Sequence, residues 1–189
     1  MKTNRLEAFS DGVLAIIITI MVLELKAPKE VTLNSLLAMT PVFLSYIFSF
    51  IYIGIYWNNH HHLFQITQKV NGKILWANLH LLFWLSLVPF TTAWIGESYY
   101  ETLPVIAYGA VLFFCAIAYF ILQAQIIKSH DNEFALRKVI GSDNKGKISI
   151  VFYALGIVFS FLNTWIAISF YVIVAIMWLI PDKRIEQSV

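Results

Sequence analysis

A stretch without a single charged residue runs from Ile148 to Ile180. A transmembrane helix needs about 20 largely apolar residues, so this stretch is too long for one helix and short for two. Asn163-Thr164 near its middle predicts a tight turn between two short helices. Other apolar stretches of spanning length precede it. Together they predict six transmembrane helices, at residues 6–26, 35–57, 74–95, 103–126, 147–162 and 164–180.

Composition supports an integral membrane protein. Of the 189 residues, 59% are hydrophobic and 13% are charged, whereas soluble domains are typically about 45–50% apolar and about 25% charged. Transmembrane strands alternate polar and apolar residues over about 10 positions, and these longer runs do not alternate. We therefore expect an all-α polytopic membrane domain over residues 1–189. The net charge of +2 comes from scattered bases, which gives no indication of nucleic-acid binding.

The distribution of Lys and Arg predicts the orientation. Most basic residues fall before the first helix, between helices two and three, between four and five, and after the sixth. The opposite side carries only Lys26 and Lys29, together with Glu97 and Glu101. The positive-inside rule then places both termini in the cytoplasm. Acidic residues interleave with the first bases, and no small-residue cleavage site follows, so we expect no cleavable signal peptide.

The first helix carries unusual charges for a membrane segment. Only 12 uncharged residues separate Asp11 from Glu24, and at 1.5 Å each they cover about 18 Å of a hydrocarbon core about 30 Å thick. Glu7, Asp11 and Glu24 therefore lie close to the core or within it. Charges at that depth face protein or a water-filled cavity, so the first helix is predicted to be packed among others or to line a pore.

The faces of this helix follow from a rotation of about 100° per residue. Ile16, Thr19, Ile20 and Leu23 share an arc of roughly 100°, whereas Asp11 lies about 140° from Ile16. The arc is apolar with one hydroxyl. Two interpretations remain open from the residues alone: simple packing residues, or a surface that lines a pore.

Three polar clusters are expected at one depth near the cytoplasmic surface. They are Ser10 with Asp11, the segment from Trp57 to His62, and Asn78 with His80. Hydrogen bonds from Ser10 and Asp11 to Trp57, His60, Asn78 or His80 would fix how the first three helices pack, since an unpaired polar group in hydrocarbon costs several kcal/mol. Arg5 could neutralise Glu7 or Asp11 from the interface.

Metal, cofactor and enzyme interpretations are not favoured. His60, His61 and His62 are adjacent and would point in different directions on a helix, with no cysteine or carboxylate at ligand spacing. The single cysteine, Cys115, lies in an apolar run and is expected to be a small core or lipid-facing residue. We find no catalytic motif and predict no cofactor and no bound metal.

Three sets of residues resemble a known family. Arg5-x-x-x-Phe9-Ser10-Asp11 on the first helix, Trp57-x-x-His60 with Leu63-Phe64, and Asn78-Leu79 followed by Pro89-Phe90 resemble the endolysosomal potassium channel family (transmembrane protein 175) and its prokaryotic homologues. Over helices four to six the resemblance rests on the number of spans and their topology.

The resemblance implies a potassium-permeable homotetramer in which the first helices line the pore. The family's pore positions fall five, eight and twelve residues after the aspartate, at Ile16, Thr19 and Leu23, with Ile20 as an alternative for the middle layer. Arg5, Phe9, Ser10 and Asp11 would then clamp the first helix against helices two and three. A single six-helix repeat is similar to the prokaryotic members, so a bacterial inner (plasma) membrane is expected.

The chain has no TVGYG filter, so selectivity would need another source. We expect collars of Ile16 and Leu23 to gate by dewetting, with moderate preference for potassium over sodium, passage of related monovalent cations, and a possible proton leak. Two other functions stay open: a secondary transporter, and a membrane scaffold that transports nothing.

Overall fold

The computed structural model describes residues 3–130 and 143–179, and its regular secondary structure in those ranges is entirely helical. The helices are α1 (Thr3–Leu23), α2 (Leu33–Ala38), α3 (Thr40–Gln65), α4 (Gly72–Ser86), α5 (Val88–Glu97), α6 (Thr102–Lys128), α8 (Asn144–Phe159) and α9 (Thr164–Leu179). The all-α fold expected from the sequence is confirmed for these residues.

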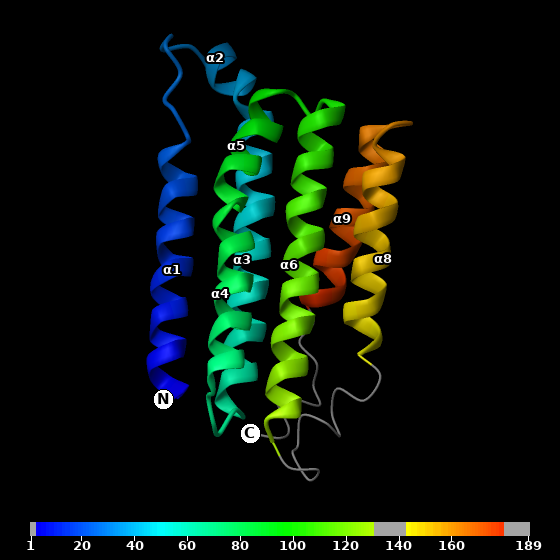
Figure 1. Cartoon of the computed structure of the whole chain (residues 1–189). Helices are drawn as coiled ribbons and strands as arrows, with labels where there is room; N and C mark the ends of the chain where they lie inside the picture. Colours follow the sequence, from blue (N-terminus) through cyan, green and yellow to red (C-terminus); the bar gives the residue numbers. More distant parts are fainter. Residues whose placement is uncertain (1–2, 131–142, 180–189) are drawn as a thin grey trace.

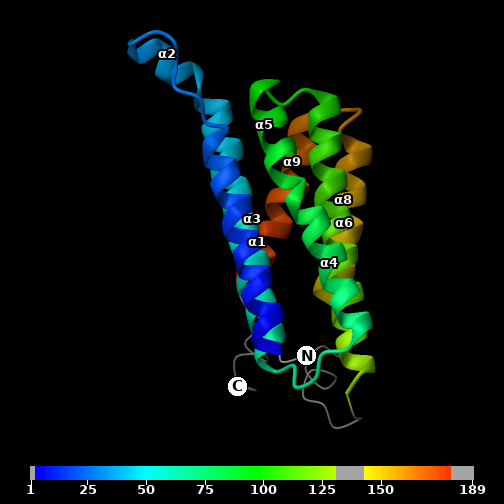
Figure 2. The same cartoon turned by 60° about the vertical axis from the view of Figure 1, so that its left-hand side comes forward.

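The long helices form an antiparallel bundle (Figure 1). α1 lies at one edge and packs against α3, α4 and α5, whereas α6 joins α4 and α5 to the α8–α9 pair. α1 starts at the end of the bundle toward which α9 runs (Figure 1). The short α2 projects from the opposite end, away from the other helices (Figure 2).

Two of the predicted helices are interrupted. The second is divided at Met39 into α2 and α3, and the third at Leu87 into α4 and α5. Each second half has a proline in its first two positions, Pro41 or Pro89. A proline lacks the backbone N–H and its ring clashes with the carbonyl four residues earlier, so a new helix starts at each proline instead of the old one continuing.

The end of the second predicted helix is wrong by two turns. We expected it to stop at residue 57, where polar residues begin, but α3 continues to Gln65. Two of these polar side chains are hydrogen-bonded inside the bundle: Asn59 Nδ2 donates to the carbonyl of Ile55 at 2.8 Å, and His60 Nε2 lies 2.8 Å from Asn78 Oδ1. A helix can therefore continue through them with these two side chains paired, whereas the buried Nδ1 atoms of His60 and His62 have no hydrogen-bond partner among the described residues.

The predicted hairpin of two short helices is present. The turn spans residues 160–163, slightly earlier than expected, and Asn163 Oδ1 accepts a hydrogen bond from the backbone N–H of Trp165 at 2.8 Å. Gly156 of α8 leaves room for the ring of Tyr171 on α9, which a Cβ at that position would overlap. The missing side chain thus permits the close approach of the two helices.

Four helical segments in the described ranges are long and apolar enough to cross a membrane: α1, α3, α4 together with α5, and α6. The described residues of α9 are apolar and number 16, which at 1.5 Å each cover about 24 Å. Cys115 of α6 is fully buried in the core of this bundle and forms no disulfide.

Candidate functional site

One stripe of α1 is left uncovered by the other described helices. Ile16 is 60% exposed, Ile20 42% and Leu23 72%, and Thr19 is exposed as well. The opposite face is buried against α3, α4 and α5 through Leu6, Ser10, Leu14, Ile17 and Met21. The four residues predicted to share an arc therefore do share a surface, and that surface faces away from the subunit's own core.

The stripe extends further toward the N-terminus than expected. Arg5 and Phe9 lie within about 20° of Ile16 around the helix; Arg5 is exposed and the side chain of Phe9 is 52% exposed. Within the described residues Arg5 has no hydrogen bond or ion pair to Glu7 or Asp11. Arg5 and Phe9 thus lie on the uncovered face of α1, and their part in clamping the helix against its neighbours stays a prediction.

A buried chain of hydrogen bonds joins α1, α4 and α3. The Asn78 side-chain amide donates to Ser10 Oγ at 2.9 Å, and Asn78 Oδ1 lies 2.8 Å from His60 Nε2. Ser10 Oγ in turn donates to the carbonyl of Leu6 at 2.9 Å. Ser10 and Asn78 are fully buried and His60 is 1% exposed, so these bonds fix the packing of three helices around one point.

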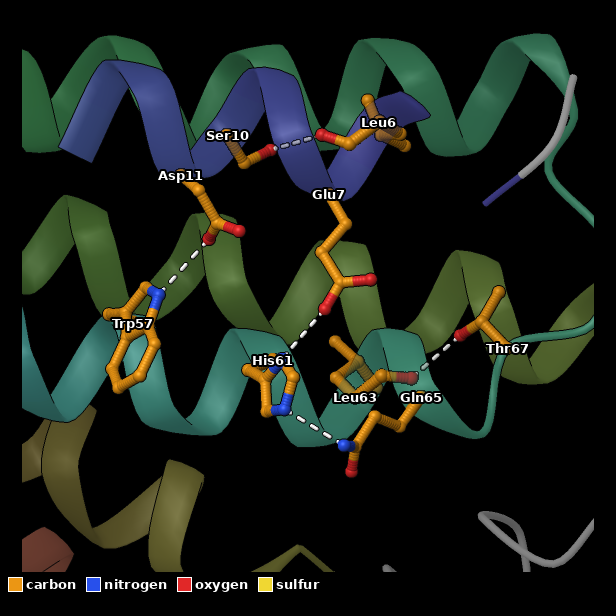
Figure 3. A network of polar contacts seen from close by, with 9 residues as sticks. All are labelled: Leu6, Glu7, Ser10, Asp11, Trp57, His61, Leu63, Gln65 and Thr67. Carbon is orange, nitrogen blue, oxygen red and sulfur yellow. Dashed lines mark hydrogen bonds and ion pairs between the residues drawn. The ribbon is translucent and has the colours of Figure 1, made fainter. Parts of the chain in front are cut away.

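A second set of contacts forms a ladder between antiparallel α1 and α3 (Figure 3). Trp57 Nε1 donates to Asp11 Oδ1 at 3.1 Å, and His61 Nδ1 lies 2.7 Å from Glu7 Oε1. Gln65 Nε2 lies 2.8 Å from the other ring nitrogen of His61, and at the end of the ladder Thr3 Oγ1 donates to the carbonyl of Thr67 at 3.0 Å. Both acidic residues of the first turns thus face protein, as expected for charges near a membrane core.

Sequence reasoning missed the pair of Glu7 and His61. A signal was available: Glu7 and Asp11 are four residues apart, as are Trp57 and His61, and residues at that spacing share one face of a helix. Two such pairs on antiparallel helices predict two adjacent contacts. We overlooked this because the segment from residue 58 onward was expected to lie outside the helix.

His80 belongs elsewhere. Its Nε2 accepts a hydrogen bond from Trp84 Nε1 at 3.0 Å, one turn further along the same α4–α5 segment. His80 lies about 160° around the helix from Asn78. Because Asn78 is on the face of α4 that contacts α1, His80 points away from α1 and takes no part in that network. The three consecutive histidines also diverge, with His60 directed to α4 and His61 to α1. No group of metal-binding residues is found in the part of the chain that the structure describes.

The hydroxyl of Thr19 is oriented by its own helix. Thr19 Oγ1 donates to the carbonyl of Ala15 at 2.9 Å. A hydroxyl has one hydrogen and two acceptor lone pairs, so the hydrogen is engaged and the lone pairs remain for a partner outside the subunit. The exposed stripe therefore presents apolar side chains above and below one acceptor oxygen.

Comparison with known proteins agrees with this geometry. The family model of the endosomal/lysosomal potassium channel TMEM175 matches residues 5–89. A protein of Chryseobacterium sp. (strain P1-3) described as a potassium channel is 62% identical over 188 residues, which cover 100% of this chain and 98% of the relative. The mouse endosomal/lysosomal proton channel TMEM175 is 31% identical over 136 residues, 64% of this chain and 27% of that protein.

A solved structure has the same fold. The crystal structure of a lysosomal potassium-selective channel TMEM175 homolog from Chamaesiphon minutus aligns with a TM-score of 0.85 at 27% identity, covering 95% of this chain and 97% of that one. These relatives are ion channels, which confirms the prediction that the chain is not an enzyme. The resemblance found in the sequence motifs is confirmed as well: the chain is a multi-pass membrane protein that belongs to the family of the endosomal/lysosomal potassium channel TMEM175.

Proposed function

We propose that the chain is the subunit of a homotetrameric, potassium-permeable channel whose pore is lined by four α1 helices. The observation that carries the proposal is the asymmetry of α1. One face is fixed to α3 and α4 by buried hydrogen bonds, while Ile16, Ile20 and Leu23 on the other face are 60%, 42% and 72% exposed. The buried hydrogen bonds hold α1 in a fixed orientation, so that its apolar stripe can meet the same stripe of three other subunits around a common axis.

The narrow part of the pore would consist of collars of Ile16 and Leu23 with Thr19 between them. The collars are separated by about 10 Å along the helix. Apolar constrictions gate by dewetting, so ions that release hydration water at lower cost pass more readily, and potassium is less costly than sodium in this respect. The lone pairs of the Thr19 hydroxyls would replace part of the lost water. Such a filter is moderately selective, passes other monovalent cations and can leak protons; Ile20 is the alternative for the middle layer.

The proposed topology has six spans with both termini in the cytoplasm of a bacterium, in the inner membrane. It is supported by the excess of Lys and Arg on one side and by the direction of α9, which runs toward the end of the bundle where α1 starts (Figure 1). The relatives from Chryseobacterium, Streptomyces and Chamaesiphon are described as potassium channels, which supports potassium as the permeating ion.

The test is the ion preference of Ile16→Asn in planar bilayers. Polar side chains in the collar should hydrate it, so the bi-ionic reversal potential should move toward higher sodium permeability. Val22→Asn is the matched control, since Val22 is 45% exposed but lies about 120° from Ile16; its reversal potential should stay at the wild-type value. Equal reversal potentials for wild type and Ile16→Asn would remove Ile16 from the constriction.

Recordings in the same bilayers distinguish the channel from the two alternatives, a secondary transporter and a scaffold. Single-channel current steps under a potassium gradient alone are expected for the channel. Flux that requires a coupled solute in fixed stoichiometry would identify a secondary transporter instead. The absence of any flux from correctly assembled protein would identify a scaffold.

A further inference from the structure

A groove of about 800 Å³ lies between the start of α4 and the last turns of α6. The residues that line it and matter here are Asn71, Lys73, Trp76, His80, Ile121 and Gln125. The start of α4 and the last turns of α6 lie at the end of the bundle where α1 starts (Figures 1 and 2), which the proposed topology places at the cytoplasmic surface. Neither the exposed stripe of α1 nor the hydrogen-bond network that joins α1 to α3 and α4 contributes a residue to the groove.

The groove lies on the side of α4 that is turned away from α1. Asn78 contacts α1, and Lys73, Trp76 and His80 are rotated from it by about 140° to 160°. Trp76 is 75% exposed. Because α1 is the proposed axis side of the subunit, the groove faces outward, where lipid is the neighbour of a membrane protein.

The polar atoms in the groove are mostly hydrogen-bond donors. Asn71 Oδ1 already accepts the backbone N–H of Ile74 at 3.0 Å, which leaves the side-chain NH₂ of Asn71. His80 Nε2 already accepts from Trp84, and an indole N–H can only donate, so a neutral His80 carries its hydrogen on Nδ1. Lys73 adds an ammonium group.

Two further features favour an anion. The indole N–H of Trp76 is a donor without acceptor capacity, and no aspartate or glutamate is among the described residues that line the groove. Gly72 and Lys73 of the first turn of α4 line the groove, and the helix dipole is positive at that end. Gln125, whose amide both donates and accepts, is the only lining side chain with acceptor atoms not already used by the protein.

The depth of the groove matches a phospholipid. From Gly72 to His80 the helix rises about 12 Å, enough to pass from the headgroup layer into the acyl region. Lys73 lies at the outer end, whereas Ala77 and Ile121 supply apolar surface. Further along, Trp84 and Phe114 stack with ring centroids 4.3 Å apart, which continues an apolar wall between the two helices.

We propose that this groove is a binding site for an anionic phospholipid of the inner leaflet. The phosphodiester would be held by Lys73, the Asn71 amide and the first turn of α4, the indole of Trp76 would lie at the interface, and an acyl chain would follow Ile121 toward Trp84. Basic pockets between helices on the cytoplasmic side are suited to anionic headgroups.

The test uses the intact assembled protein in vesicles of phosphatidylcholine with increasing phosphatidylglycerol. Brominated acyl chains on one lipid or the other quench nearby tryptophans, and the difference between wild type and Trp76→Phe isolates the signal of Trp76. We expect brominated phosphatidylglycerol to quench Trp76 at lower mole fraction than brominated phosphatidylcholine. Lys73→Gln should reduce that preference by about fivefold, the factor expected for one lysine near an anionic headgroup.

Lys69→Gln is the matched control, because Lys69 is exposed in the connection that precedes α4 but does not line the groove. An equal loss of preference in both variants would show bulk surface charge and overturn the site. Equal quenching by both lipids in the wild type would overturn it too, independently of any variant. Absence of quenching by either lipid would mean that a second copy of the chain covers the groove. Each of these results is independent of the ion-conductance measurement that tests the pore.

Discussion

Replacing Asn78 with leucine should destabilise the bundle more than any exposed substitution on the same helices. Asn78 is fully buried and bridges Ser10 and His60. Without it, His60 loses the partner of Nε2, while its Nδ1 already has none among the described residues. Ser10 keeps its bond to the carbonyl of Leu6, so one buried imidazole carries most of the loss.

The size of the effect follows from that count. Leaving one buried polar group unpaired costs about 1–3 kcal/mol, so we expect about 2 kcal/mol for Asn78→Leu. In a chain of this length that lowers the melting temperature by about 4–8 °C. The assay is thermal unfolding of the purified protein in detergent, followed by tryptophan fluorescence. Asn34→Leu, at an exposed position of α2, is the control and should leave the melting temperature unchanged.

A double variant makes the reasoning refutable. His60→Leu combined with Asn78→Leu removes both partners, and replacing both by apolar groups of similar shape can be nearly neutral. The double variant should therefore melt higher than Asn78→Leu alone. If the two single losses simply add, or if Asn78→Leu melts with the wild type, the bridge does not stabilise the bundle in the way described.

Three further predictions follow from single contacts. Thr19→Val removes the acceptor oxygen and should lower the potassium-to-sodium permeability ratio about threefold, the effect of roughly 0.5–1.5 kcal/mol per lost contact, in bi-ionic recordings; an unchanged ratio would move the middle layer to Ile20. Gly156→Ala forces a Cβ against the ring of Tyr171 and should cost about 1–3 kcal/mol of stability, read as a lower melting temperature; a wild-type value would mean that the hairpin adjusts freely. Asp11→Ala should reduce the tetramer fraction measured by light scattering after size exclusion, and Asp11→Asn, which keeps an acceptor oxygen, should restore it; normal assembly with altered ion preference would instead place Asp11 in the pore.

The sequence predicted the long apolar helices because their composition determines them. It located α6 within two residues at each end and recognised the α8–α9 hairpin. It failed where tertiary contacts decide. The helix α3 continues to Gln65, where Asn78 of α4 pairs with His60 and Glu7 of α1 pairs with His61, and no local pattern contains that information.

For the candidate site, the angular position of each residue around α1, calculated from the sequence, was the reliable basis for grouping residues by face. It grouped Ile16, Thr19, Ile20 and Leu23 and separated Asp11 from them, which agrees with the exposed and covered faces of α1. The same rotation, applied to Arg5 and Phe9, would have placed them on the exposed stripe. We assigned them to the clamp because they share a motif with Ser10 and Asp11, and residues close in a motif need not share a face.

The ladder between α1 and α3 has a consequence for the isoleucine run that follows it. Residues 16, 17, 18 and 20 are all isoleucine, so hydrophobicity alone offers almost no preference for one angular phase of the helix over the next. A turn of about 100° would exchange Ile16 for Ile17 with little change in apolar contact. Such a turn would, however, separate Asp11 from Trp57 and Glu7 from His61 together. The two polar contacts near the start of α1 therefore fix the rotation of the helix about its axis. In this way they determine which isoleucines are exposed up to three turns away.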